Sequence, residues 1–216
     1  MKTNVQTPME VFTQPQRFLV PLFQRPYVWN EERQWEPLWR DVERLAERVL
    51  TSGNTTTSPH FLGAVVLQQL PNVTGELQGR IIVDGQQRLT TLQLLMDAIH
   101  GECMDQGFNG PARRLELLIQ NQDAYQNKPE DQFKVWPTTR DKQAFYEVMA
   151  PKSKIDYTTL KHSSARLVLA HRYFAERTRE WLMEAGIESA AQRAEALDLA
   201  VRTLLQIVVI DLQIDE

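Results

Sequence analysis

Apolar residues repeat with two different periods along the chain, and these periods predict where strands and helices lie. Residues 17–29, RFLVPLFQRPYVW, begin as a short strand and end in a turn set by Pro26, which fixes φ and lacks a backbone donor. Apolar side chains then recur every three or four positions in residues 31–48, after the helix-capping residue Asn30. The pattern therefore predicts a strand, a turn and an amphipathic helix in this order.

A β-hairpin is predicted next, after a low-complexity loop at 51–59. FLGAVVLQQL (61–70) and GRIIVDG (79–85) have strand composition and flank a connection that contains Pro and Gly. From Leu89 the apolar period becomes 3.6, and we expect Gly101 to end this helix. The remaining segments are predicted as helices at 112–126, 140–150, 163–184 and 189–202 and a strand at 204–216.

This order of elements predicts an α/β (α+β) fold: a small mixed sheet that carries a strand–turn–helix site and packs against a mainly helical lobe. We expect a core at residues 1–105 and a helical lobe with a returning strand at 106–216. Because the sequence ends on strand composition, without a helix or turn to cover it, we also expect that the natural protein continues further.

Composition narrows the classes of function. The 216 residues carry a net charge of −4, which argues against a surface that coats DNA, so any nucleic-acid contact must be local. A single cysteine leaves no internal disulfide and no cysteine-based metal cluster. No apolar run reaches the length of a membrane span and the N-terminus lacks a signal-peptide core, so a cytoplasmic protein without membrane contact is expected.

The most polar strand end lies in the stretch GRIIVDGQQRLTTLQLL. A helix that starts after Asp84-Gly85 presents its first backbone N–H groups beside Arg88, which is an arrangement that binds phosphate. Asp84 could hold Mg²⁺, and Thr90 and Thr91 would add hydroxyl donors. The alternative is a plain turn in which Asp84 caps the helix and Arg88 is a surface charge.

A second candidate site lies in the segment VPLFQRPYVW. Gln24 and Arg25 stand among aromatic residues, a composition that suits stacking on a base or holding a modified phosphate. The alternative is an aromatic edge of the core with an exposed arginine. The four histidines have no metal-ligand spacing and are expected at the surface or at helix ends, and Asp97 is expected to be solvated.

Four stretches resemble, in order, the N-terminal domain of the GmrSD-like family, which is related to the ParB and sulfiredoxin fold. They are VPLFQRPYVWNEERQWEPLWRDV, HFLGAVVL, IIVDGQQRLTTLQLLMDAI and KVWPTTRDKQAF. The resemblance implies a domain that binds and hydrolyses an NTP, senses modified double-stranded DNA and controls a C-terminal His-Asn-His nuclease domain of the same protein. Phosphorothioate is the DNA modification that we favour. This chain ends before the segment at which the family continues, so the nuclease is expected only in a longer parent protein.

The resemblance also implies roles for residues of both motifs. In the nucleotide motif, Asp84 would hold Mg²⁺, Gln86 or Gln87 would orient water and Arg88 would stabilise phosphate charge. The residues expected to contact the nucleotide are Gly85, Arg88, Leu89, Thr90 and Thr91. The residues expected to contact DNA are Gln24, Arg25, Pro26, Tyr27 and Trp29. Three alternatives remain open: a nucleotide-dependent DNA-binding switch without significant hydrolysis, a module that reads DNA without a nucleotide, and a reader of glucosylated hydroxymethylcytosine.

Overall fold

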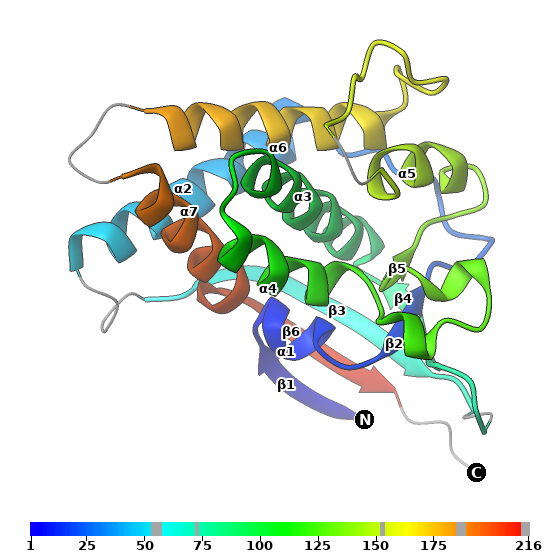
Figure 1. The fold of residues 1–216 in the computed structure, drawn as a ribbon. Helices are drawn as coiled ribbons and strands as arrows, with labels where there is room; N and C mark the ends of the chain where they lie inside the picture. Colours follow the sequence, from blue (N-terminus) through cyan, green and yellow to red (C-terminus); the bar gives the residue numbers. More distant parts are fainter. Residues whose placement is uncertain (53–57, 72–73, 152–153, 185–188, 213–216) are drawn as a thin grey trace.

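A computed structural model describes residues 1–52, 58–71, 74–151, 154–184 and 189–212. The chain forms one six-stranded mixed sheet with the order β1-β6-β3-β4-β2-β5, and its helices lie together on one side of that sheet (Figure 1). The predicted α+β class with a mixed sheet is therefore confirmed. The strands are β1 (Lys2–Gln6), β2 (Gln16–Leu19), β3 (His60–Gln69), β4 (Gln78–Asp84), β5 (Val135–Trp136) and β6 (Leu205–Leu212).

The helices agree in position with most of the predicted helical segments. They are α1 (Pro8–Phe12), α2 (Glu36–Ser52), α3 (Gln86–Asp105), α4 (Asn109–Ile119), α5 (Lys142–Met149), α6 (Arg166–Met183) and α7 (Ala190–Leu199). A π-helical turn at Glu31–Trp35 leads into α2, and Asn30 caps it as predicted by accepting a hydrogen bond from the Arg33 backbone N–H. No helix in the described part of the chain is long and apolar enough to cross a membrane.

The predicted hairpin and the predicted last strand are both present and adjacent in the sheet. β3 and β4 pair in antiparallel fashion, with Val66 opposite Asp84. β6 lies parallel to β3 and antiparallel to β1, so it is an inner strand. Parts of the predicted loop at 51–59 and of the predicted strand at 204–216 lie outside the described residues.

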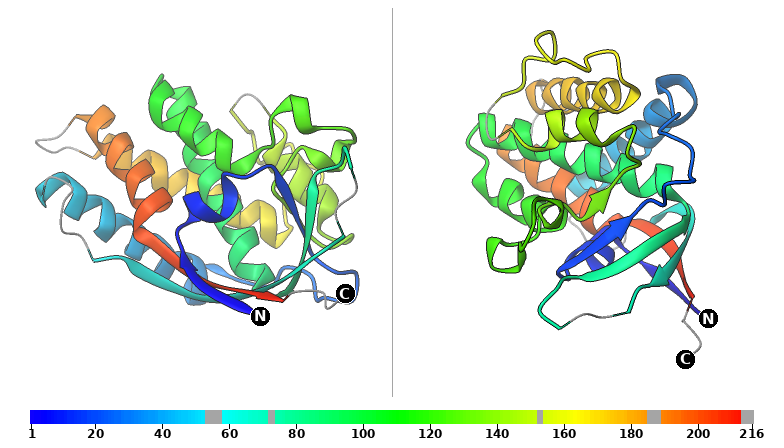
Figure 2. Two further views of the ribbon diagram at one scale, coloured as in Figure 1. Left: turned by 90° about the horizontal axis from the view of Figure 1, so that it is seen from below. Right: turned by 90° about the vertical axis from the view of Figure 1, so that its right-hand side faces the viewer.

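Helix α3 is the central element of the core. Its residues are buried on almost all sides, because β3 and β5 lie on one side of it and α4 and α6 pack on others (Figure 2). The prediction that Gly101 ends this helix was wrong: α3 continues to Asp105, and the turn follows at Gly107, whose φ of +79° is left-handed. A helix buried all round is what positions its N-terminus firmly at the end of β4.

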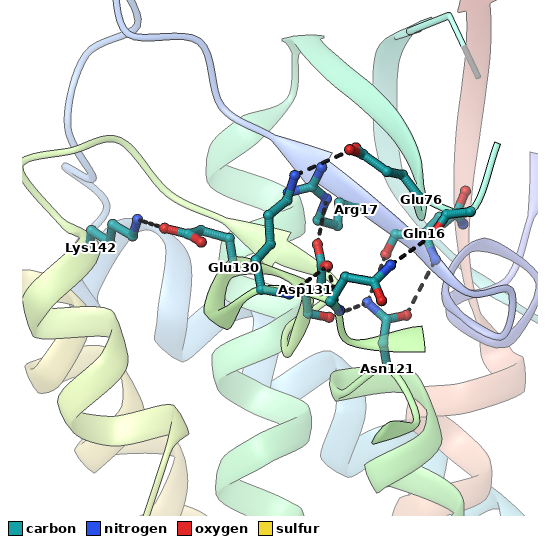
Figure 3. A network of polar contacts seen from close by, with 10 residues as sticks. Gln16, Arg17, Glu76, Asn121, Glu130, Asp131 and Lys142 are labelled. Carbon is teal, nitrogen blue, oxygen red and sulfur yellow. Dashed lines mark hydrogen bonds and ion pairs between the residues drawn. The ribbon is translucent and has the colours of Figure 1, made fainter. Parts of the chain in front are cut away.

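A polar network holds the N-terminal end of β2 (Figure 3). Arg17 Nε lies 3.3 Å from Oδ1 of the buried Asp131, whose other carboxylate oxygen accepts from the Lys128 backbone N–H. Asn121 donates to the backbone carbonyls of Gln16 and Asp131 at 3.2 and 2.9 Å. These contacts tie β2 to the segment after α4, and β2 leads directly into the loop of the second candidate site.

Candidate functional site

The turn between β4 and α3 requires a glycine. Gly85 has φ +87° and ψ 14°, a left-handed conformation, and precedes the first residue of α3. A Cβ at this position would lie 2.5 Å from Cγ1 of Val65 and 3.1 Å from the carbonyl oxygen of Ala64. The turn therefore lies directly against β3, closer than any other residue type would allow.

The N-terminus of α3 has no side-chain cap. The first amide that donates in the helical pattern belongs to Leu89, at 3.2 Å from the carbonyl of Gly85. The backbone N–H groups of residues 86–88 have no acceptor in the described part of the chain. Asp84 is exposed and does not cap the helix, so the alternative of an aspartate-capped turn was wrong. Donors at a helix N-terminus that lack an acceptor favour an anion.

The side chain of Gln86 binds the loop that follows β2. Its Nε2 donates to the carbonyl of Arg25 at 2.9 Å and lies 3.4 Å from Oε1 of Gln24. Gln24 in turn donates to the carbonyl of Val83 at 3.0 Å. The two sequence motifs therefore contact each other through the side chains of Gln24 and Gln86.

Gln87 holds the next part of the same loop and uses both ends of its amide. Nε2 donates to the carbonyl of Pro26 at 3.2 Å, and Oε1 accepts from the backbone N–H of Val28 at 3.0 Å and of Trp29 at 3.4 Å. A side chain with these three backbone contacts acts as a clamp for the loop. The Oε1 atom of Gln86, in contrast, has no hydrogen-bond partner in the described part of the chain.

Tyr27, which we expected to contact DNA, is a buried strut between the two motifs. The residue is 6% exposed, its hydroxyl lies 2.7 Å from Oγ1 of Thr91, and it accepts from Nε1 of Trp35 at 2.9 Å. Burial raises the pKa of the Tyr27 phenol far above its usual value. A side chain held in this way stacks against neither base nor sulfur without a rearrangement of the loop.

The accessible part of the loop is made by its first residues. Phe23 is 86% exposed and Leu22 is similarly exposed, which is unusual for apolar side chains of this size. Arg25 is also exposed, and it forms no ion pair within the described residues. Trp29 is half-buried and packs against the core. The loop therefore presents two apolar side chains and one guanidinium together.

Asp141 is a residue of this site to which we assigned no role, although it lies in the KVWPTTRDKQAF stretch. Its Oδ2 accepts from the Tyr27 backbone N–H at 2.8 Å and from the Thr138 hydroxyl at 2.9 Å. Thr138 and Asp141 are three residues apart, and this spacing indicates a local turn. It does not indicate that Asp141 binds the loop after β2. The contact of Asp141 with Tyr27 spans 114 positions and had no local signal.

The residues of α3 that we expected to contact a nucleotide fall into two groups that differ in burial. Leu89, Thr90 and Thr91 are buried, and the Thr91 hydroxyl donates to the carbonyl of Gln87 at 2.7 Å. These side chains therefore support the helix and lie away from the surface that a nucleotide would reach. Arg88 is half-buried and donates from Nη1 to the carbonyl of Ala64 at 2.9 Å, so it is not the free surface charge of the alternative interpretation.

Two polar residues of the core were wrongly predicted, Asp97 as solvated and His171 as a histidine at the surface or at a helix end. Asp97 and His171 are both buried, and Nε2 of His171 lies 2.9 Å from Oδ2 of Asp97. The other ring nitrogen, Nδ1, lies 2.7 Å from the Tyr157 hydroxyl. The three side chains join α3, α6 and the segment before α6.

A magnesium ion would find one suitable ligand at this site. The described residues contain no group of three or more His, Cys, Asp or Glu side chains that could hold a metal ion. The exposed carboxylate of Asp84 nevertheless stands next to the N-terminus of α3 and forms no hydrogen bond or ion pair within the described chain. Mg²⁺ commonly binds through one carboxylate together with substrate phosphates, so this donor set fits the ion only when a nucleotide is bound.

The fold and site define a mixed α+β domain in which the glycine turn between β4 and α3 is hydrogen-bonded to the loop after β2. Residues 9–215 match the family described as the GmrSD restriction endonuclease, N-terminal domain. The match covers nearly the whole chain, so the chain belongs to this family, as the motif resemblance predicted. No curated protein is similar enough to the chain to count as a relative. Membership in the family makes this domain a component of a modification-dependent restriction system that targets DNA together with a nuclease partner domain.

Proposed function

We propose that this domain binds and hydrolyses an NTP at the N-terminus of α3 and reads modified DNA with the loop after β2, thereby controlling a nuclease domain of the same protein. The observation that carries this proposal is the clamp between the motifs. Gln86 and Gln87 at the anion-binding turn hold the backbone of residues 25–29. A ligand that moves the first turn of α3 must therefore also move the loop, and the reverse holds as well.

Each part of the turn has a defined role in this proposal. The N–H groups of residues 86–88 and the Arg88 guanidinium bind the phosphates and stabilise the charge that develops on them. Asp84 holds Mg²⁺, which neutralises phosphate charge when it is bound. Gln86 is the better candidate for orienting water, because its Oε1 atom lacks a partner in the described part of the chain while both ends of Gln87 are occupied.

The exposed part of the loop suits a phosphorothioate linkage. Sulfur is larger, more polarisable and less strongly hydrated than oxygen, so a reader needs an apolar wall beside a cation. Phe23 and Leu22 supply an accessible wall and Arg25 the cation, while Tyr27 supports the loop from below. A glucosylated base would require a roomy pocket with several hydrogen-bonding groups, and this short segment offers fewer of them.

Single-turnover assays with radiolabelled ATP and GTP test the proposal. We expect phosphate release in the presence of Mg²⁺, altered by phosphorothioate duplex but not by the unmodified duplex of the same sequence. Arg88→Ala should reduce nucleotide affinity by about 10- to 100-fold, the loss of a charge-assisted hydrogen bond. The matched control is Arg113→Ala, which removes an exposed arginine of α4 without an ion pair in the described part.

The alternatives give different results in the same assays. Nucleotide binding without phosphate release would identify a switch. DNA binding that is lost in Arg88→Ala, without nucleotide binding by the unaltered domain, would identify a module that reads DNA alone. A preference for glucosylated over phosphorothioate duplex would change the assigned modification and leave the nucleotide site intact. Unchanged nucleotide affinity in Arg88→Ala would contradict the phosphate-binding role.

A further inference from the structure

Arg88 lines a small cavity beside the first turns of α3. The cavity has a volume of about 170 Å³ and lies between α2, the start of β3, α3 and the loop after β2. Its charged or titratable lining residues are Arg88, Asp41 and His60, and its walls are otherwise mostly apolar. Of these three residues, only Arg88 has been given a role in catalysis above. His60 was expected to be an ordinary surface or capping histidine.

Gly63 makes room for the guanidinium group in this cavity. Its φ is +97°, and a Cβ there would lie 3.0 Å from Nε of Arg88. Arg88 uses Nη1 for the Ala64 carbonyl, and no carboxylate in the described part of the chain forms an ion pair with it. An arginine has five N–H donors, so several remain for an anion in the cavity.

His60, at the start of β3, and Asp41, on α2, form a histidine–carboxylate pair in the lining of the same cavity. Nε2 of His60 lies 3.1 Å from Oδ2 of Asp41, and Oδ1 of the same carboxylate pairs with Arg44 on α2. Nδ1 of His60 has no hydrogen-bond partner among the described residues. A carboxylate beside Nε2 favours the tautomer with a proton on Nε2, which leaves the lone pair of Nδ1 as a proton acceptor.

The volume limits what the cavity can hold. Water occupies about 30 Å³ per molecule in the liquid, so 170 Å³ corresponds to about five or six such groups. That is room for one phosphoryl group and an attacking water. The nucleoside would then lie outside the cavity.

We propose that the cavity receives the terminal phosphoryl group of the NTP, that His60 accepts the proton of the attacking water and that Asp41 is its positioning residue. This inference rests on the NTP hydrolysis proposed above, and it assigns the attacking water to His60 in place of Gln86, which does not line the cavity. The water oxygen forms a bond to the terminal phosphorus as the bond to the bridging oxygen breaks. The NDP leaves with that electron pair, and the proton passes from water to Nδ1 of His60 and then to solvent.

The test compares His60→Gln with His162→Gln in the full chain, using ATP and GTP with Mg²⁺. His162 is a matched control, because its ring also pairs with a carboxylate, that of Glu147 at 2.8 Å, at similar side-chain exposure: 30% against 35% for His60. We expect His60→Gln to lower kcat by about 100- to 10,000-fold with little change in KM, and His162→Gln to leave both unchanged.

The pH profile separates proton transfer from a structural role. Asp41, Arg44 and Arg88 are the charged groups around His60 from the elements that enclose it. The acidic limb of the kcat profile should vanish in His60→Gln, because no base remains to accept the water proton, and Asp41→Asn should lower kcat by less than His60→Gln, because it leaves the base in place. Thermal melting checks folding, with His60→Asn as a second variant.

The possible failures are distinguishable. If the unaltered domain hydrolyses an NTP and both His60 variants keep its rate and pH profile, the role of His60 is overturned and the proposed function stands. If the unaltered domain releases no phosphate from either NTP, with or without phosphorothioate duplex, the proposed hydrolysis and this inference are both overturned.

Discussion

The hydroxyl groups of Tyr27 and Thr91 lie 2.7 Å apart and join the loop after β2 to the second turn of α3. The two residues are 64 positions apart in the sequence, and each belongs to a motif that was interpreted on its own. Their contact is buried and continues to Nε1 of Trp35 in the turn before α2. The two motifs are therefore one structural unit, so a substitution in either motif should affect the other.

Tyr27→Phe should destabilise the fold without removing the aromatic ring. The hydroxyl accepts from Trp35 and contacts Thr91, and its loss leaves the buried indole N–H without an acceptor. The cost should be about 1 to 3 kcal/mol, measured by urea unfolding. Tyr146→Phe is the control: Tyr146 is 48% exposed and its hydroxyl has no partner in the described part of the chain, so a change within about 0.5 kcal/mol is expected. Equal stabilities of the two variants would contradict the structural role of the Tyr27 hydroxyl.

Gly85→Ala should damage both stability and nucleotide binding. The left-handed backbone costs an alanine about 1 to 2 kcal/mol, and the collision with Val65 at 2.5 Å adds a packing penalty of about 1 to 3 kcal/mol. Because the turn must shift to relieve the collision, the N–H groups of residues 86–88 move as well. Calorimetric titration with ATP and GTP should show weaker binding.

Gly101→Ala is the comparison for this variant. Gly101 is a glycine within α3, and a Cβ there would meet no atom within 4 Å. Replacing an interior helical glycine with alanine should raise the free energy of unfolding by about 0.5 to 1 kcal/mol and leave nucleotide binding unchanged. A Gly85→Ala protein as stable as the unaltered one would show that the turn tolerates a side chain.

The extent to which the sequence predicted the structure depends on how local each signal is. The Asp84-Gly85 turn, the hairpin and the helix at Asn30 are encoded by neighbouring residues, and all three are present. The short strands β1 and β5 were not predicted, because five and two residues carry too little periodicity. The sequence also did not indicate which residues far apart in the chain contact each other in the fold. The clamp by Gln86 and Gln87 spans about 60 positions.

Asp97 shows why periodicity was insufficient within α3. Asp97 lies off the leucine stripe, and in a helix with one buried face such a position would be exposed to solvent. Helix α3, however, is packed on nearly every side. Its partner His171 lies 74 positions away on α6. A buried carboxylate requires such a partner, yet one sequence does not identify it.

A double-mutant cycle of Asp97→Ala and His171→Ala should reveal strong coupling. Each single variant leaves a buried polar group without its partner, so each should cost about 2 to 4 kcal/mol in urea unfolding. The double variant should cost less than the sum by at least about 1 kcal/mol. The Glu147 and His162 pair, which is more exposed, should show coupling below about 1 kcal/mol in the same cycle. Additive effects at Asp97 and His171 would contradict their buried contact.

Lys134 should make stability rise with pH in the alkaline range. The side chain is 2% exposed, donates to the Gln14 carbonyl at 2.9 Å and has no carboxylate partner in the described part of the chain. Burial lowers the pKa of Lys134 from its ordinary value of 10.5 to about 8. Between these values the unfolded chain binds one proton more than the folded chain, so raising the pH favours folding, by about 3 kcal/mol over the whole window.

The comparison with Lys134→Met isolates this contribution. Below pH 8 the lysine is charged in both states and its burial cost is fully present, so the methionine variant should be the more stable protein. The difference should shrink as pH rises from 8 to 9.5. This range ends before the tyrosines begin to ionise in the unfolded chain, while in the folded chain burial raises the pKa of Tyr27 and Tyr157. Urea unfolding at half-unit pH steps measures it. Lys142→Met, which removes a half-exposed ammonium paired with Glu130, should show no such trend. A constant difference between Lys134→Met and the unaltered protein would mean that Lys134 keeps its proton in the folded state throughout this range.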